Sequence, residues 1–109
     1  MITINIAKDF SETPGGRYIS DGQFSGELFR TTLLKNAVEQ AVLTKSKIAI
    51  NFDGCYGFST GFLEEAFGGF VRAYQVFDLY ELLDIISTED ETIPAKIKEY
   101  IHDAERLLQ

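Results

Sequence analysis

The chain has 109 residues, of which 45% are hydrophobic, so we expect one domain over residues 1–109 with a core of its own. The net charge of −7 and the lack of a basic patch disfavour nucleic acid and anionic membranes as partners, and no apolar run approaches the ~20 residues that span a bilayer. The single cysteine, Cys55, cannot form an internal disulfide and lies in no zinc-binding pattern, so a reducing cytoplasm with no metal and no cofactor is expected.

The N-terminal part of the chain predicts a strand, a turn and a helix. Ile2, Ile4 and Ile6 alternate with polar residues, which is the period of a half-buried strand. A Pro-Gly-Gly turn follows, and residues 17–20 are expected to form a second short strand that pairs back on the first. Ser25 is then placed to cap a helix with an apolar stripe that runs to about residue 43.

The middle of the chain predicts a strand and a second helix. Residues 48–52 form a short apolar run between helices, which indicates a central strand buried on both faces. Residues 59–74 carry apolar side chains at helical spacing, with Gly68 and Gly69 in the middle. Each glycine costs about 1 kcal/mol in a helix relative to alanine, so we expect the pair to allow another backbone to approach closely.

Two further elements complete the chain. Residues 82–86 predict a strand, and a last helix with an apolar stripe from Ile97 to Leu108 starts near Pro94. Strands that alternate with helices predict a largely parallel sheet with right-handed crossovers. The expected fold class is therefore α/β, a small mixed and mainly parallel sheet packed against helices, with an antiparallel edge contributed by residues 17–20.

Several segments carry a resemblance to a known family. These are Asn51-Phe52-Asp53-Gly54, Gly57-Phe58-Ser59-Thr60, residues 62–69, and upstream Gly15-Gly16-Arg17-Tyr18 and residues 24–30. Together they resemble the prokaryotic STAS-like domain family of unknown function over nearly the whole chain. The wider STAS group includes the anti-sigma factor antagonists. In those proteins a kinase of the histidine-kinase-like ATPase fold phosphorylates a serine at the start of the helix after a central strand, and this switches binding to the kinase.

The resemblance implies a regulatory protein-interaction domain that is not an enzyme, with a histidine-kinase-like ATPase as its partner. Ser59 is then the phosphoacceptor candidate, with Thr60 beside it, although the antagonists have an aspartate where this chain has Phe58. The residue type and position of Ser59 are also typical of a helix N-cap, whose hydroxyl accepts a hydrogen bond from an amide two or three residues later.

The expected interaction surface comprises the loop before the second helix and the first turns of that helix. Its residues are Asp53, Gly54, Tyr56, Gly57, Phe58, Gly61, Glu64 and Glu65. Asp53 is also typical of a turn before glycine, and the two glutamates also suit the positive end of the helix dipole. Arg17 is a candidate to bind an anion or to neutralise Asp53. A homodimer through Tyr74, Phe77 and Tyr80 is an open alternative to packing of these rings within the chain.

The same residues also match the patterns of two other functions. The helix start after Ser59 suits a small-anion or nucleotide-binding module, although no GxxxxGK[ST] motif is present. Residues 57–61 also match the GxSxG pattern of hydrolases, with Asp78 or Asp84 and His102 in triad order. The α/β-hydrolase scaffold needs a much longer chain, so no catalytic residues are expected. Cys55 has no basic neighbour in sequence to lower the pKa of its thiol.

Overall fold

Alternating isoleucines build a parallel sheet at the base of the molecule. The computed structural model describes residues 1–109, and strands β1 (Ile2–Asn5), β2 (Ile48–Asn51) and β3 (Leu83–Ile86) pair in the order β1-β2-β3, all parallel. In register, Ile4 pairs with Ile50 and Ile50 with Ile85, so one face of the sheet is a continuous apolar surface. The strands predicted from Ile2, at residues 48–52 and at residues 82–86 are confirmed, with β2 in the centre, although Ile6 begins the helical turn after β1.

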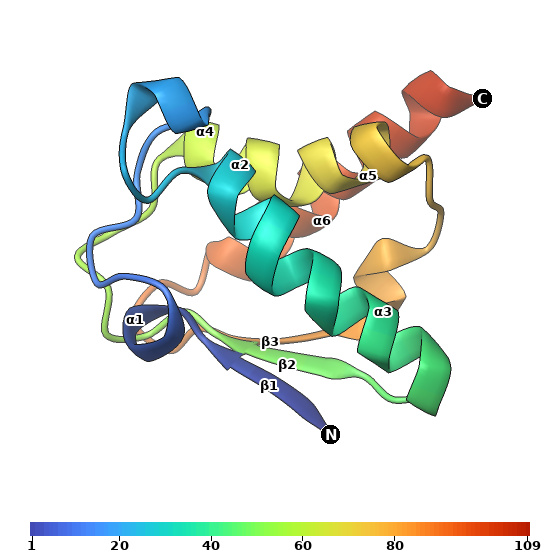
Figure 1. Cartoon of the computed structure of the whole chain (residues 1–109), viewed down its shortest axis with the longest axis horizontal. Helices are drawn as coiled ribbons and strands as arrows, with labels where there is room; N and C mark the ends of the chain where they lie inside the picture. The colour runs from blue at the N-terminus through green and yellow to red at the C-terminus, as the bar shows by residue number, and fades with distance from the viewer.

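Three long helical segments lie over that apolar face (Figure 1). The first two each contain a turn of π-helix, which divides them without a break in the chain. They are α2 (Gly26–Phe29), η2 (Arg30–Leu34) and α3 (Lys35–Thr44); α4 (Thr60–Leu63), η3 (Glu64–Gly68) and α5 (Gly69–Tyr74); and α6 (Ile93–Leu108). Ser25 caps the first of them, since its side chain accepts a hydrogen bond from the Leu28 amide at 3.1 Å. Pro94 lies in the first turn of α6, as expected.

Short helical turns join these elements. They are α1 (Ile6–Asp9), η1 (Ile19–Asp21) and η4 (Leu79–Leu82). None of the helices combines the length and the apolar character that crossing a bilayer requires.

Phenylalanines fill the space between the helices and the sheet. Phe29, Phe62 and Phe67 are fully buried, and Phe29 lies within 6.1 Å of both other rings, measured between ring centroids. Phe10, from the loop after α1, meets Phe29 edge-on at 5.4 Å. Aromatic contacts of this kind contribute about 0.5–1.5 kcal/mol each beyond the burial of their area. This cluster holds the starts of α2 and α4 side by side above the carboxyl ends of the strands.

The predicted strand at residues 17–20 is wrong, and the sheet has no antiparallel edge. Residues 19–21 form the single turn η1 instead, with the Asp21 carboxylate accepting a hydrogen bond from the Tyr18 amide. The carbonyls of Gly16 and Arg17 accept hydrogen bonds from the first amides of α2, at Gly26 and Glu27. These carbonyls satisfy the start of a helix and are therefore not available to a strand ladder.

The expectation that the central strand is buried on both faces is confirmed, since Ile48, Ala49 and Ile50 are all buried. The helices lie on one face of the sheet only (Figure 1). On the other face Thr3 and Asp84 flank Ala49 in register, and both are exposed. Ala49 is nevertheless 7% exposed, because its small side chain lies between those two larger neighbours.

Candidate functional site

Ser59 is the N-cap of α4, where the second long helical segment begins. Its backbone is extended, with φ −75° and ψ 154°, and its Oγ accepts a hydrogen bond from the Phe62 amide at 3.0 Å. Ser59 and Thr60 are both exposed. The N-cap predicted from the sequence is therefore confirmed, and Ser59 is exposed at the start of a helical segment.

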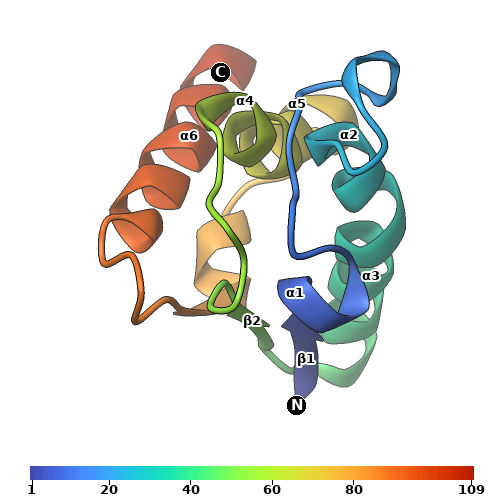
Figure 2. The ribbon, with the colours of Figure 1, turned by 90° about the vertical axis from the view of Figure 1, so that its left-hand side faces the viewer.

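The loop that leads to Ser59 rises from the carboxyl end of β2 beside the loop that follows α1 (Figure 2). The Tyr56 amide donates to the Glu12 carbonyl at 2.9 Å, which joins the two loops. The Tyr56 side chain is 86% exposed. An aromatic ring in open solvent, on a loop with an anchored backbone, is typical of a contact surface.

Asp53 links the β2–α4 loop to the loop after β3 through hydrogen bonds. Its carboxylate accepts hydrogen bonds from the Thr88 hydroxyl at 2.6 Å, the Thr88 amide at 2.9 Å and the Glu89 amide at 3.0 Å. The Thr88 hydroxyl is the main reason that the pKa of Asp53 lies below its ordinary value. Gly54, with φ +92°, donates its amide to Glu89 Oε1 at 2.7 Å. Asp53 therefore has a structural role between two loops.

Arg17 pairs with the glutamates of the second helix and not with Asp53. Its guanidinium lies 2.5 Å from Glu64 Oε1, and Arg72 reaches the other Glu64 oxygen at 2.6 Å. The hydrogen bond from Arg72, followed by the one from Arg17, holds the pKa of Glu64 below its ordinary value despite partial burial. Both arginines are thus engaged, and the prediction that Arg17 neutralises Asp53 is wrong.

Glu65 is buried and belongs to the interior. Its residue exposure is 6%, and its carboxylate lies 3.3 Å from Arg30 and 3.4 Å from Arg72. It cannot offer a contact to a partner, so its inclusion in the predicted surface is wrong. Glu64, with a side chain 22% exposed and two arginines on its oxygens, has little left to offer either.

The two mid-helix glycines make room for these glutamates. A Cβ at Gly68 would lie 2.5 Å from Glu64 Oε2, and a Cβ at Gly69 would lie 2.6 Å from Glu65 Oε2. The expected close approach of a backbone is present at Gly68, where the Tyr100 carbonyl of α6 would lie 3.1 Å from such a Cβ. The main neighbours, however, are the carboxylates, each folded back over the glycine four residues later.

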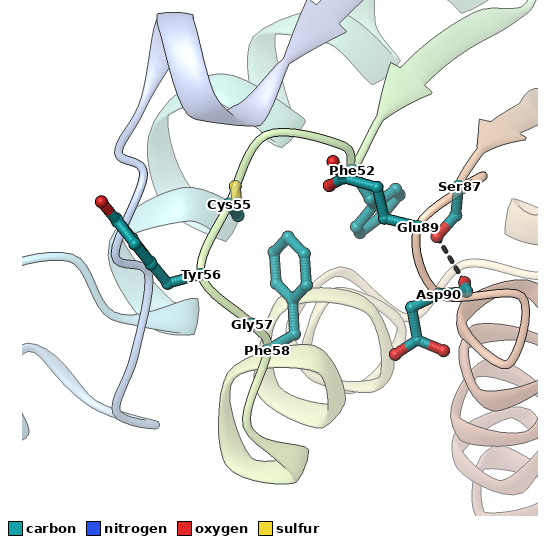
Figure 3. A pocket seen from close by; sticks show the side chains of 8 residues that line it. All are labelled: Phe52, Cys55, Tyr56, Gly57, Phe58, Ser87, Glu89 and Asp90. Atoms are coloured by element: carbon teal, nitrogen blue, oxygen red, sulfur yellow. Dashed lines mark hydrogen bonds between the residues drawn. The ribbon is translucent and has the colours of Figure 1, made fainter.

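A cavity of about 330 Å³ lies between the β2–α4 loop and the β3–α6 loop (Figure 3). Its lining residues are Phe52, Cys55, Tyr56, Gly57, Phe58, Ser87, Glu89 and Asp90. The rings of Phe52 and Phe58 meet edge-on at 5.2 Å, and the Tyr56 side chain points away from them. Burial, with the charges of Glu12 and Glu89, raises the pKa of the Cys55 thiol to about 11, so the thiol stays protonated at neutral pH.

Sequence reasoning missed the β3 half of this cavity. The interaction surface expected from the sequence includes Phe58 and its loop but neither Glu89 nor Asp90. A signal was present, because both segments directly follow parallel strands, and the carboxyl ends of parallel strands meet at one edge.

The other predicted residues are not brought together around Ser59. The one hydrogen bond of Ser59 Oγ comes from the Phe62 amide, while His102 is exposed on α6. Of the aromatics expected at a dimer contact, Tyr74 packs on Phe70 at 4.6 Å, and Tyr80 lies beneath the Lys98 ammonium at 5.8 Å. Only Phe77, at 51%, is strongly exposed.

Comparison with known proteins identifies the family. The model of the STAS-like domain of unknown function (DUF4325) matches residues 25–92, which is more than half of the chain. No curated protein and no solved structure matches the chain significantly. The matched segment begins at Ser25, the N-cap of α2, includes Ser59 and β3, and ends at the residue before α6. The chain therefore belongs to the family of STAS-like domains of unknown function.

Proposed function

We propose that this domain is a regulatory protein-interaction module whose recognition surface is the β2–α4 loop, Gly54 to Gly61, with the exposed start of α4. The observation that carries the proposal is the placement of Ser59. Ser59 is exposed at a helix start, three residues from a tyrosine that is 86% exposed. A charged modification of Ser59 therefore changes the charge of the surface close to the exposed ring of Tyr56.

Phosphorylation of Ser59 is the switch that we propose. A phosphate at this position carries about −1.5 to −2 charge at neutral pH, next to the free amides and the positive dipole end of the helix. The fold tolerates that group, because phosphate oxygens accept hydrogen bonds as the hydroxyl oxygen does. The partner, by the resemblance to anti-sigma factor antagonists, is a histidine-kinase-like ATPase.

The anion-binding alternative has weaker support. It needs a free cation beside the helix start, and Arg17 was the candidate. Its guanidinium is held by Glu64 at 2.5 Å, with Glu65 at 3.8 Å. We therefore do not propose it as a second function.

The test is phosphorylation by histidine-kinase-like ATPases from the same organism, each purified and mixed with the domain and ATP. Mass spectrometry of peptides is expected to place one phosphate on Ser59 with at least one ATPase of the panel. Ser59→Ala should then lose the phosphate, and Thr60→Ala should keep it. Phosphate on both variants at the wild-type rate, or on neither the wild type nor any variant with every ATPase, contradicts the proposed switch.

A further inference from the structure

The cavity at the carboxyl edge of the sheet has apolar walls and an acidic rim. Phe52, which is 2% exposed, forms its floor, and the half-buried ring of Phe58 points into the space between the two loops (Figure 3). Glu89 and Asp90 enter from the β3–α6 loop. The volume of about 330 Å³ is at the small end of the roughly 300–1,000 Å³ that ligand sites have, so it suits one side chain better than a large molecule.

Both carboxylates retain an oxygen for a ligand. Glu89 uses Oε1 for the Gly54 amide, and Asp90 uses Oδ1 for the Thr92 amide and hydroxyl. The second oxygen of each has no hydrogen-bond partner within the chain. No lysine or arginine lines the cavity, so these charges are not neutralised from inside.

The surrounding groups keep the potential of this site negative. Hydrogen bonds from Thr92 hold the pKa of Asp90 below its ordinary value, so the carboxylate is ionised at neutral pH. Burial is the main cause of the high pKa of Cys55 on the opposite wall, and the negative charges of Glu12 and Glu89 add to it. Lys96, exposed on the first turn of α6, is the cation that acts on Asp90 from outside the cavity.

We infer that this cavity receives a lysine or arginine side chain from the partner protein. The inference rests on the proposed function and adds which kind of side chain on the partner the domain recognises. The methylene stem of such a side chain packs along Phe52 and Phe58, while its cationic head reaches the free oxygen of either Glu89 or Asp90. A cation within about 6 Å of an aromatic ring gains further attraction from the ring face. Charge complementarity therefore selects a basic segment over a neutral one.

The test uses single residues as probes and needs no partner. Amide shifts of the ¹⁵N-labelled domain are followed while N-acetyl-lysine methylamide, N-acetyl-arginine methylamide or N-acetyl-norleucine methylamide is added to tens of millimolar. Saturable shifts are expected for at least one cationic probe, clustered at residues 55–58 and 87–90. Norleucine, which has a similar stem and no charge, should give no saturation. Equal saturation by norleucine, or none by either cation, overturns the inference.

Matched variants separate a local site from general attraction to an acidic protein. Glu89→Gln with Asp90→Asn keeps the oxygens that accept from Gly54 and Thr92 but removes two charges. It should weaken cation binding at least tenfold. Glu39→Gln with Glu99→Gln removes two exposed charges from α3 and α6, and binding should stay within twofold. If the two pairs weaken binding equally, attraction is not local and the inference fails.

Folding and the proposed function are controlled separately. Should the double variant unfold, Glu89→Gln and Asp90→Asn alone are each expected to weaken binding at least threefold, and no change in either contradicts the inference. Ser59→Ala should bind the cationic probe as the wild type does. A domain that is phosphorylated on Ser59 but binds no cation therefore refutes the cavity alone. A domain that binds the cation but accepts no phosphate refutes the switch alone.

Discussion

At Ser59 one hydroxyl holds the start of a helix and at the same time faces solvent. Loss of an N-cap hydrogen bond costs about 1 kcal/mol, because a backbone amide is left without a partner. Ser59→Ala is expected to lower the free energy of unfolding by roughly that amount in urea titrations. Ser59→Asp, whose carboxylate also accepts from an N-terminal amide, should keep wild-type stability. Equal stability of all three proteins contradicts the capping role.

The glutamate network predicts a stability that depends on pH. The pKa of Glu64 is lowered in the folded state, so its contribution is fully present above about 4.5, the ordinary value, and is lost as the pH falls through the folded pKa. Glu64→Gln is expected to cost about 1–2 kcal/mol at pH 7, a figure that allows for the partly exposed Arg72. The difference from wild type should shrink below pH 4.5.

Urea titrations at pH 7 and pH 3 measure that difference. Glu39→Gln is the control, since Glu39 is exposed and forms no ion pair. A cost for Glu64→Gln that is the same at both pH values refutes the assigned role of the carboxylate.

At the scale of elements, the two long helices meet at Gly26. A Cβ there would lie 2.5 Å from the Phe62 carbonyl and 3.2 Å from the Ala66 amide, both of which are backbone atoms. Neither atom can move without shifting a whole helix, so the contact cannot relax locally. The close approach of α2 to α4 and η3 therefore depends on the absence of a side chain.

Gly26→Ala is expected to destabilise the protein by roughly 1–3 kcal/mol, the usual cost of overpacking, even though alanine is the better helix former. Thermal unfolding measures this cost. The matched control is Gly15→Ala, where nothing lies within 4 Å of the added Cβ. Similar midpoints for the two variants contradict the close crossing.

The elements that the sequence predicts correctly are those whose signals are local. Ser25 and Ser59 each cap a helix by accepting a hydrogen bond from the amide three residues later in the sequence. The isoleucines of β1 alternate with polar residues over a few positions. The conformation of residues 17–20 could not be predicted, because it depends on contacts with α2, such as the hydrogen bond from the Glu27 amide to the Arg17 carbonyl. The Glu64–Gly68 spacing is visible in the sequence, whereas the ion pair of Glu64 with Arg17, 47 residues away, follows only from the tertiary fold.

For the whole molecule, the arrangement is one-sided. Helices cover one face of the sheet, and the loops after β2 and β3 lie at its carboxyl edge (Figures 1 and 2). The cavity lies between these loops, and Tyr56 and Ser59 belong to the β2–α4 loop. The opposite sheet face presents polar side chains such as Thr3 and Asp84. The proposed recognition surface is therefore the loop edge, and the uncovered sheet face is left to solvent.

The most direct test of that claim is an amide-shift map of the ¹⁵N-labelled domain during titration with the panel of histidine-kinase-like ATPases. For the ATPase that binds, the largest changes are expected at residues 54–61 and 87–90, with the uncovered sheet face unaffected. Changes centred on Thr3, Ala49 and Asp84, or no change with any ATPase of the panel, would contradict the account.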